Sequence, residues 1–486
     1  MAKSLVVLET GIASAWARLA LLHLAFLGAA IWLKYGVGRA RPGGARLVLA
    51  TPILALSVAG PWIFNGADEV LPRLSTLFIF SWLCTFKVLA FCVGRAPLRE
   101  GMTVAQLAAI MMLPVFPKPE NRAKEAPEGR LQDTAGSGAA LASRWLAKLV
   151  LLGAVVWLLT GYGDDMPGAA RHYLYAFGMY AFVGFLMDGP GAVTVEALGL
   201  QLVPTFDAPW LSTSLADFWG RRWNITTSSV LRTLVYDPLA EGRLVPDTAV
   251  AGAAAAGGGA TAGIGTGLTS GINSRAPSTS KLSARGGAAA GGDAAAEPAD
   301  ADAPGVSARV QTGAEGARRE AGSGGSRGTS AKGAARPPVS GGLRPSLLRR
   351  QLGLHASFLI SGLVHEYLAW NITGIGWHWK WTLFFYMQAP LMTLEGLGRR
   401  WLRRRGLPPP PRLLANLITV ALLEAMAYPL FFGFVETNTD LAKRVVAAVS
   451  HNYQEVLQPL RPLLASAAAA LAGGSGAAGA SPQREL

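Results

Sequence analysis

The chain has 486 residues, of which 51% are hydrophobic, and it carries a formal net charge of +14. Repeated apolar runs of about 20 residues exclude an ordinary soluble domain and indicate a membrane protein. No nucleic-acid-binding motif accompanies the basic charge, so we attribute it to membrane topology and attraction to anionic headgroups rather than to nucleic-acid binding.

Apolar segments long enough to cross a hydrocarbon core recur along the chain. We expect an all-α, polytopic membrane protein with about eight transmembrane helices. The expected spans are residues 19–33, 47–64, 74–93, 145–162, 173–187, 352–372, 379–397 and 413–434.

The short loops between these segments alternate in charge. The basic loops carry Lys34, Arg39, Arg41 and Arg46, then Arg95, Arg99 and Lys118, and later Arg399, Arg400, Arg403, Arg404 and Arg405. The acidic loops carry Asp68 and Glu69, and then Asp164 and Asp165. Because short cytosolic loops favour Lys and Arg, this order predicts a lumenal N-terminus.

A change in composition divides the chain. Residues 1–240 form an N-terminal membrane region of about five spans, and residues 346–465 form a C-terminal region of about three. Between them, residues 241–345 are rich in Gly, Ala and Ser and lack aromatic side chains, which predicts a disordered cytosolic insertion. The tail, residues 466–486, is expected to be flexible as well.

One apolar segment does not fit a simple span. Residues 102–116 are apolar, but Pro114, Pro117 and Pro119 close the segment. It could lie in the membrane interface or re-enter the bilayer.

The run "SFLISGLVHEYLAW", residues 357–370, is apolar except for His365 and Glu366. An ionisable side chain within a span is costly, so it usually faces a protein or water-filled interior. His365 could act as a general base or merely hydrogen-bond between helices. Glu366 lies about 100° further round the helix, where it could pair with an arginine, stay protonated or line a cavity.

A second polar segment, "DFWGRRWN", runs from Asp217 to Asn224. An asparagine amide can orient a substrate or donate to an oxyanion, arginines can bind phosphate, and tryptophans can pack against a base or an acyl chain. The competing interpretation is an amphipathic interfacial helix whose arginines contact headgroups. The residues alone leave the two interpretations about equal.

No metal site or resident cofactor is expected. The six histidines lack the close His, Cys and carboxylate spacings of a zinc site. A serine nucleophile elbow and a phosphate-binding glycine loop are also absent from the sequence.

Taken together, "SLADFWGRRWNITTSSVLRTLVYDPL" and, downstream, "SFLISGLVHEYLAW" resemble the wax synthase-like branch of the membrane-bound O-acyltransferase family. Both motifs of that branch occur here in the family's order. The chain departs from the family in two ways: Thr233 and Leu234 replace a usual proline, and the connection between the motifs is much longer.

The resemblance implies an acyltransferase that moves a fatty acyl group from acyl-CoA, as co-substrate, to the hydroxyl of a lipophilic alcohol, with wax esters as products. It implies catalytic roles for His365 and Asn224. The residues that it places at the acyl-CoA site are Asp217, Trp219, Arg221, Arg222, Trp223 and Glu366.

Other functions stay open. The acceptor could instead be a sterol or diacylglycerol, because each presents one hydroxyl on an apolar body. From another class, a membrane transporter or scaffold could use His365 and Glu366 as a proton relay or a clamp between helices. The expected location is a multi-pass position in the endoplasmic reticulum membrane, and the sequence does not specify an oligomeric state.

Overall fold

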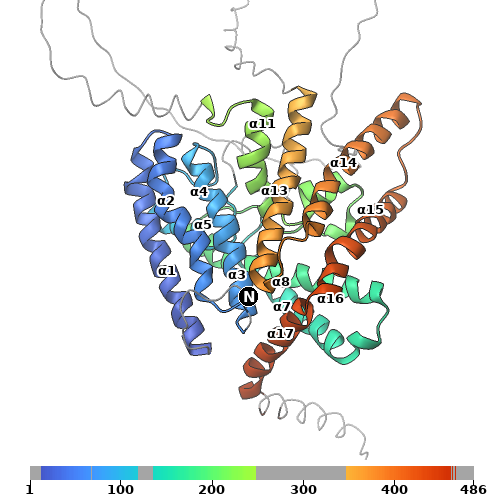
Figure 1. Cartoon of the computed structure of the whole chain (residues 1–486), viewed down its shortest axis with the longest axis horizontal. Helices are drawn as coiled ribbons and strands as arrows, with labels where there is room; N and C mark the ends of the chain where they lie inside the picture. The colour runs from blue at the N-terminus through green and yellow to red at the C-terminus, as the bar shows by residue number, and fades with distance from the viewer. Residues whose placement is uncertain are drawn as a thin grey trace, which may run out of the picture. The chain divides into compact units, whose positions relative to one another are not determined.

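The structure, a computed structural model, describes residues 12–66, 68–118, 135–247 and 346–460, together with residues 462 and 466. These residues belong to one compact unit formed from Met1–Ala262 and Arg344–Leu486. The described part of the chain contains helices and no strand, apart from one isolated bridge between Pro117 and Leu202. The expected all-α polytopic fold is confirmed (Figure 1).

Three long helical segments form the first part of the bundle. They are α1 (Ile12–Tyr35), α2 (Gly44–Ala59) with its extension η2 (Gly60–Ile63), and the continuous run α3 (Val70–Thr76), η3 (Leu77–Cys84) and α4 (Thr85–Cys92). The rings of Phe26 and Phe80 stack at their centre with centroids 4.3 Å apart. Ala50 and Ile53 of α2 belong to the same buried apolar cluster, so burial of these side chains holds the three segments together.

The proline-flanked segment forms a short buried helix, α5 (Val104–Met112). A capping box of Thr103 and Gln106 begins it. At its other end the fully buried Lys87 donates to the carbonyl oxygens of Ile110 and Leu113, at 2.8 and 2.9 Å. Backbone that ends at membrane depth must be satisfied by protein groups. These contacts satisfy the backbone at the end of α5 within the protein, and the choice between an interfacial and a re-entrant segment stays a prediction.

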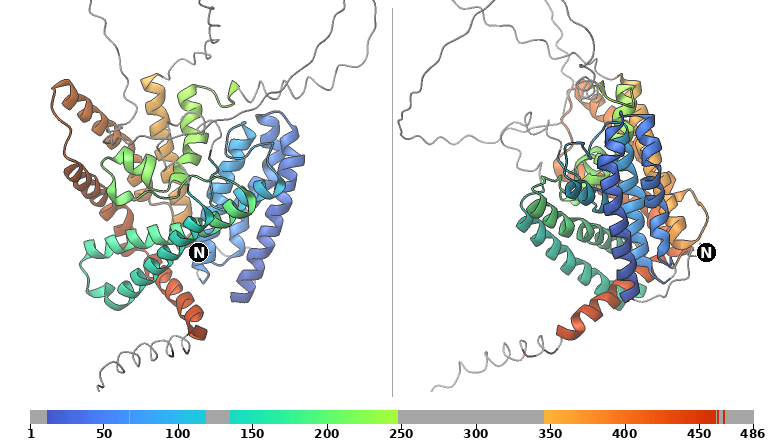
Figure 2. Two further views of the ribbon diagram at one scale, coloured as in Figure 1. Left: turned by 180° about the vertical axis from the view of Figure 1, so that it is seen from behind. Right: turned by 90° about the vertical axis from the view of Figure 1, so that its left-hand side faces the viewer.

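The helices α7 (Gly138–Tyr162) and α8 (Gly168–Leu198) form a hairpin that runs obliquely to α1 and α2 (Figure 2). Inside it, the buried Lys148 pairs with Asp188, whose other oxygen accepts a 3.1 Å hydrogen bond from Thr205. A buried charge pair needs such additional hydrogen bonds to offset its lost hydration.

The segment that carries "DFWGRRWN" folds as a series of short turns after this hairpin. They are η5 (Pro209–Leu211), α9 (Leu215–Asp217), the π-helical turn η6 (Phe218–Arg222), α10 (Ile225–Leu231), the π-helical turn η7 (Arg232–Tyr236) and α11 (Asp237–Glu241). This segment is therefore not one continuous amphipathic helix.

The C-terminal region contains the remaining helices. They are α13 (Leu347–Thr373), α14 (Lys380–Arg404), α15 (Arg412–Ala427), the π-helical turn η8 (Tyr428–Phe432), α16 (Gly433–Asn438) and α17 (Leu441–Leu457). In Figure 1, α13 lies between the N-terminal helices and α14. It contacts both sides, because Arg73 of α3 donates to Asn371 of α13 and the α13 ring of His365 meets Phe385 of α14.

The count of eight spans is not confirmed. Six of the described helical segments are long and apolar enough to cross a membrane, namely 14–39, 44–63, 70–92, 138–165, 168–198 and 412–438. Residues 352–372 lie within α13 as expected, and residues 380–397 of the expected span 379–397 lie within α14. These two helices carry buried polar side chains such as Glu366 and Gln388, and polar groups lower the hydropathy of a segment even where protein covers them.

The loops sort into two groups that match their charges. In the basic group, Gly43 N–H donates to the Cys92 carbonyl at 2.7 Å, and Arg95 donates to Leu244 at 2.9 Å. In the acidic group, α17 reaches both loops, because Lys443 lies 3.9 Å from Asp164 and Arg444 donates to the carbonyl of Gly66. Alternation along the sequence therefore corresponds to alternation between helix ends, and the lumenal N-terminus stays a prediction.

The insertion and the tail lie mostly outside the described residues. Of residues 241–345 the structure describes 241–247, and it describes nothing after residue 466. The two predictions of disorder therefore stay predictions.

Candidate active site

His365 is held in one orientation by its own helix. Its Nδ1 lies 2.7 Å from the carbonyl oxygen of Ser361, one turn earlier on α13, and donates to it. A neutral imidazole with its proton on Nδ1 has an unprotonated Nε2. Among the described residues the only hydrogen bond of this imidazole is the one at Nδ1, so the lone pair of Nε2 is available to accept a proton.

Two aromatic rings pack directly against the imidazole. Phe385 of α14 stacks on it with centroids 3.9 Å apart, and Trp82 of η3 meets it at 4.9 Å and a steep interplanar angle of 75°. The rings of Trp381 and Phe431 lie farther away, at 6.3 and 6.5 Å. Residues distant in sequence thus place aromatic rings around the half-buried His365.

Glu366 faces away from this environment and contacts the beginning of α14. Its side chain is fully buried, and Oε1 accepts a 3.1 Å hydrogen bond from the backbone N–H of Thr382, the third residue of that helix. Its Oε2 lies 3.3 Å from Nε2 of His378. A carboxylate at a helix N-terminus is stabilised by the helix dipole and by free N–H groups. In the described part of the chain, Glu366 therefore contacts Thr382 and His378 and does not form the ion pair with an arginine that the sequence left open.

His378, in the turn between α13 and α14, is a partner that sequence reasoning missed. Its Nδ1 accepts from the Lys380 N–H at 3.1 Å, so the neutral ring carries its proton on Nε2, next to Glu366. Burial lowers the pKa of His378, and the Glu366 carboxylate opposes that shift. No fixed spacing in the sequence indicated this contact, because the path of the turn after α13 determines which residue meets Glu366.

The close packing of α13 against α14 requires the glycine of the motif, Gly362. A Cβ atom at this position would lie 2.7 Å from Cα of Thr382, which is closer than van der Waals contact permits. The glycine therefore allows α14 to approach α13 closely enough for Glu366 to reach Thr382 and for Phe385 to reach His365.

The charged residues of the upstream motif pair with one another. The buried Asp217 accepts from Arg221 at 3.0 Å and from Arg222 at 2.8 Å, and Arg222 also donates to the carbonyl of Asp207. Asp217 and Arg222 thus maintain the fold of this segment. Arg221, whose side chain is 60% exposed, uses only its Nε in this pairing.

Asn224 adopts a left-handed backbone conformation with φ of 39°, which asparagine tolerates better than most residues. Its Oδ1 accepts a 3.2 Å hydrogen bond from the Thr227 N–H and so caps α10. With the oxygen engaged in this cap, Nδ2 is the part of the amide that can donate to a ligand.

Trp219 connects the upstream motif to the helices of the second motif. Its Nε1 donates to Gln388 of α14 at 3.0 Å, and its ring lies 5.7 Å from Phe385, which itself stacks on His365. The Phe385 ring therefore lies between Trp219 and His365 and contacts both. Trp223 instead stacks on Phe218 with centroids 5.5 Å apart.

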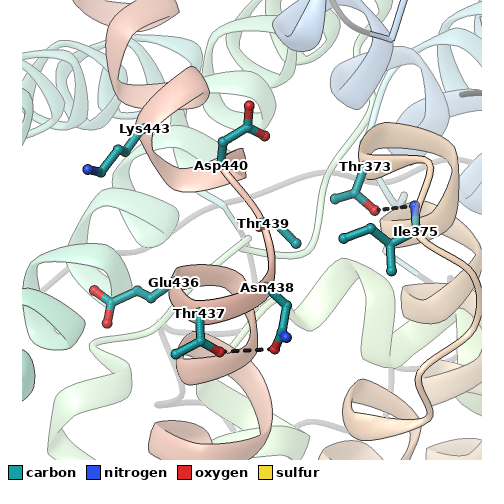
Figure 3. A pocket seen from close by; sticks show the side chains of 8 residues that line it. All are labelled: Thr373, Ile375, Glu436, Thr437, Asn438, Thr439, Asp440 and Lys443. Carbon is teal, nitrogen blue, oxygen red and sulfur yellow. Dashed lines mark hydrogen bonds between the residues drawn. The ribbon is translucent and has the colours of Figure 1, made fainter.

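An open depression of about 560 Å³ lies elsewhere, where α13 ends and α16 meets α17 (Figure 3). Its lining residues are Thr373, Ile375, Glu436, Thr437, Asn438, Thr439, Asp440 and Lys443. Thr373 follows His365 by eight residues, or about 12 Å along a helix. The depression is polar and separate from the imidazole, so we do not assign the acyl chain to it.

The sequence is similar to several curated acyltransferases. It is 28% identical over 221 residues to the long-chain-alcohol O-fatty-acyltransferase of Simmondsia chinensis, covering 44% of this chain and 59% of that protein. It is 31% identical over 200 residues to the probable long-chain-alcohol O-fatty-acyltransferase 9 of Arabidopsis thaliana, covering 41% of this chain and 54% of that protein. The resemblance to wax synthase-like acyltransferases is confirmed.

A relative with another named acceptor is similar too. The acyl-CoA–sterol O-acyltransferase 1 of Arabidopsis thaliana is 27% identical over 196 residues, covering 40% of this chain and 55% of that protein. The chain thus spans between half and two thirds of the length of these curated relatives. No family model matches the chain.

Proposed function

We propose that this protein is an integral membrane O-acyltransferase that esterifies a long-chain alcohol with the acyl group of acyl-CoA. The observation that carries the proposal is the geometry of His365, whose Nδ1 is held by Ser361 while Nε2 has no partner in the described part of the chain. An imidazole so arranged, within a helix bundle and beside aromatic rings, is suited to remove a proton from an apolar alcohol.

In the proposed reaction, Nε2 of His365 takes the hydroxyl proton as the alcohol oxygen attacks the thioester carbonyl carbon. The resulting tetrahedral intermediate carries an oxyanion, which Nδ2 of Asn224 stabilises by donating a hydrogen bond. The C–S bond then breaks, and the imidazolium returns its proton to the CoA thiolate. The sequence of steps consumes no other reactant and needs no resident cofactor.

The proposal also assigns a membrane location and an orientation. The acyl chain and the alcohol are apolar, whereas the phosphates of CoA require water, so the thioester must meet the alcohol near the boundary of the bilayer. We place the CoA head on the cytosolic side, where the exposed Arg221 could contact phosphate, and the protein in the endoplasmic reticulum.

The decisive experiment compares His365→Ala with His355→Ala in isolated membranes supplied with labelled acyl-CoA and a fatty alcohol. We expect His365→Ala to reduce ester formation about 10²- to 10⁴-fold, the usual contribution of a general base. His355 is a matched control, because it lies on the same helix and its Nδ1 bonds the Gln351 carbonyl at 2.9 Å in the same way. Ester formation by a normally expressed His365→Ala protein at the wild-type rate would refute the proposal.

A sterol acceptor is the second candidate, and the similarity to a named sterol acyltransferase favours it. Membranes that express the protein should be given fatty alcohols, sterols and diacylglycerol in competition, and the esters identified by mass spectrometry. A predominance of sterol esters would change the acceptor while leaving the assignment of His365 intact.

A further inference from the structure

Trp82 contacts His365 and has a buried indole N–H without an acceptor, and the reaction proposed above gives it no role. It lies in the π-helical turn η3, far in sequence from both motifs, and only 3% of its surface is exposed. Its ring is 4.9 Å from the imidazole of His365. Its indole N–H is buried and has no acceptor among the described residues.

Two other indoles near the site do have acceptors. Nε1 of Trp381 donates to the carbonyl of Phe431 at 3.2 Å, and Nε1 of Trp219 donates to Gln388 at 3.0 Å. A buried donor without an acceptor costs free energy, and native structures rarely retain one without a reason. An acceptor that arrives with the substrate would provide that reason.

The local backbone is consistent with a functional position. A π-helical turn is rare in proteins and occurs often at functional sites. Here, η3 spans Leu77–Cys84 within a helical segment otherwise built from ordinary α turns, and it determines which side of the helix Trp82 occupies beside His365.

We propose that Trp82 is a further catalytic residue, whose Nε1–H donates to the substrate oxygen that becomes negatively charged during acyl transfer. The inference rests on the proposed function, because it requires His365 to act on an alcohol and a thioester. Attack of the alcohol on the carbonyl carbon forms a C–O bond, moves the hydroxyl proton to His365 and places the negative charge on the former carbonyl oxygen. The indole N–H stabilises that charge until the C–S bond breaks and the thiolate recovers the proton.

The test replaces Trp82 with 3-benzothienylalanine, which keeps the size and shape of the indole but has sulfur in place of the N–H. We expect kcat to fall about 10²-fold, as when one oxyanion donor is removed from other enzymes. KM and the melting temperature should stay close to the wild-type values, because the packing is retained. The simpler variant Trp82→Phe should lower kcat as well.

The same replacement at Trp381 is the matched control. Its N–H already bonds the Phe431 carbonyl, so its loss should lower the melting temperature while the folded protein retains activity. If the Trp82 analogue has the wild-type kcat, or loses activity only in proportion to lost folded protein, the inference is wrong. If wild-type membranes form no ester, or His365→Ala is fully active, the proposed function itself has failed, and the two failures are thus distinguishable.

Discussion

At the scale of single residues, the side chain of Asn224 has a structural role in capping α10 and a proposed catalytic role in acyl transfer. Its Oδ1 caps α10, and its φ of 39° suits asparagine, aspartate and glycine better than other residues. These are structural reasons for an asparagine at this position. A catalytic role needs a different atom of the same amide, Nδ2.

Asn224→Asp distinguishes the two roles. Aspartate keeps an oxygen for the cap and tolerates the left-handed backbone, but it has no Nδ2 donor and places negative charge near the proposed oxyanion. We expect the melting temperature to change little and kcat to fall about 10²- to 10³-fold. Measured ester formation near the wild-type rate would mean that Asn224 is only a helix cap.

At the scale of elements, the motif that contains His365 is a docking surface for α14. Ser361 orients the imidazole, Gly362 allows close approach, and Glu366 accepts the N–H of Thr382. Two of these three interactions, those of Gly362 and Glu366, reach α14, and all three come from less than two turns of α13. This explains why an apolar segment carries a histidine beside a glutamate: the histidine can accept a proton, and the glutamate holds the neighbouring helix.

Gly362→Ala should disturb this docking. Its Cβ would meet the Thr382 backbone at 2.7 Å, which flexible side-chain motion cannot relieve. We expect about 1–3 kcal/mol of destabilisation, as for other overpacked positions. Acyl transfer should fall as well, because Phe385 would shift from His365.

Gly396→Ala provides the comparison on α14, because a Cβ there would meet no atom within 4 Å. Alanine at that position should leave stability unchanged or raise it by up to about 1 kcal/mol. Thermal unfolding in detergent measures both variants, and equal melting temperatures for the two would contradict the docking role of Gly362.

At the scale of the whole molecule, the two ends of the long insertion are attached to the same part of the bundle. Arg349, near the start of α13, donates to the Glu241 carbonyl at the end of α11, at 3.2 Å. Arg95 also binds this region, with 2.7 Å to the Glu241 carboxylate and 2.9 Å to the Leu244 carbonyl. The chain thus leaves and re-enters the unit at neighbouring points, independently of the residues between them.

Replacing residues 251–343 with a short Gly/Ser linker should therefore preserve the fold. The entropic cost of loop closure depends only weakly on loop length, so the shorter connection should not destabilise the unit. We expect a melting temperature within about 4 °C of wild type, which corresponds to roughly 1 kcal/mol or less in a domain of ordinary size. Ester formation in membranes should persist, and its loss in a well-folded deletion variant would instead indicate a functional role for the insertion.

The helical membrane fold and the positions of most helical segments could be predicted from the sequence, because the length of an apolar run and the position of a polar residue within it are local properties. The roles of the site residues stay predictions. The count of about eight spans stays a prediction, because α13 and α14 carry more polar side chains than the six segments that are apolar enough to cross a membrane. The partners of these residues became visible in the three-dimensional fold: His378 and Thr382 contact Glu366, Phe385 and Trp82 contact His365, and Trp219 links the two motifs. These contacts join distant segments across turns and helix faces, and no sequence period specifies which of them will meet.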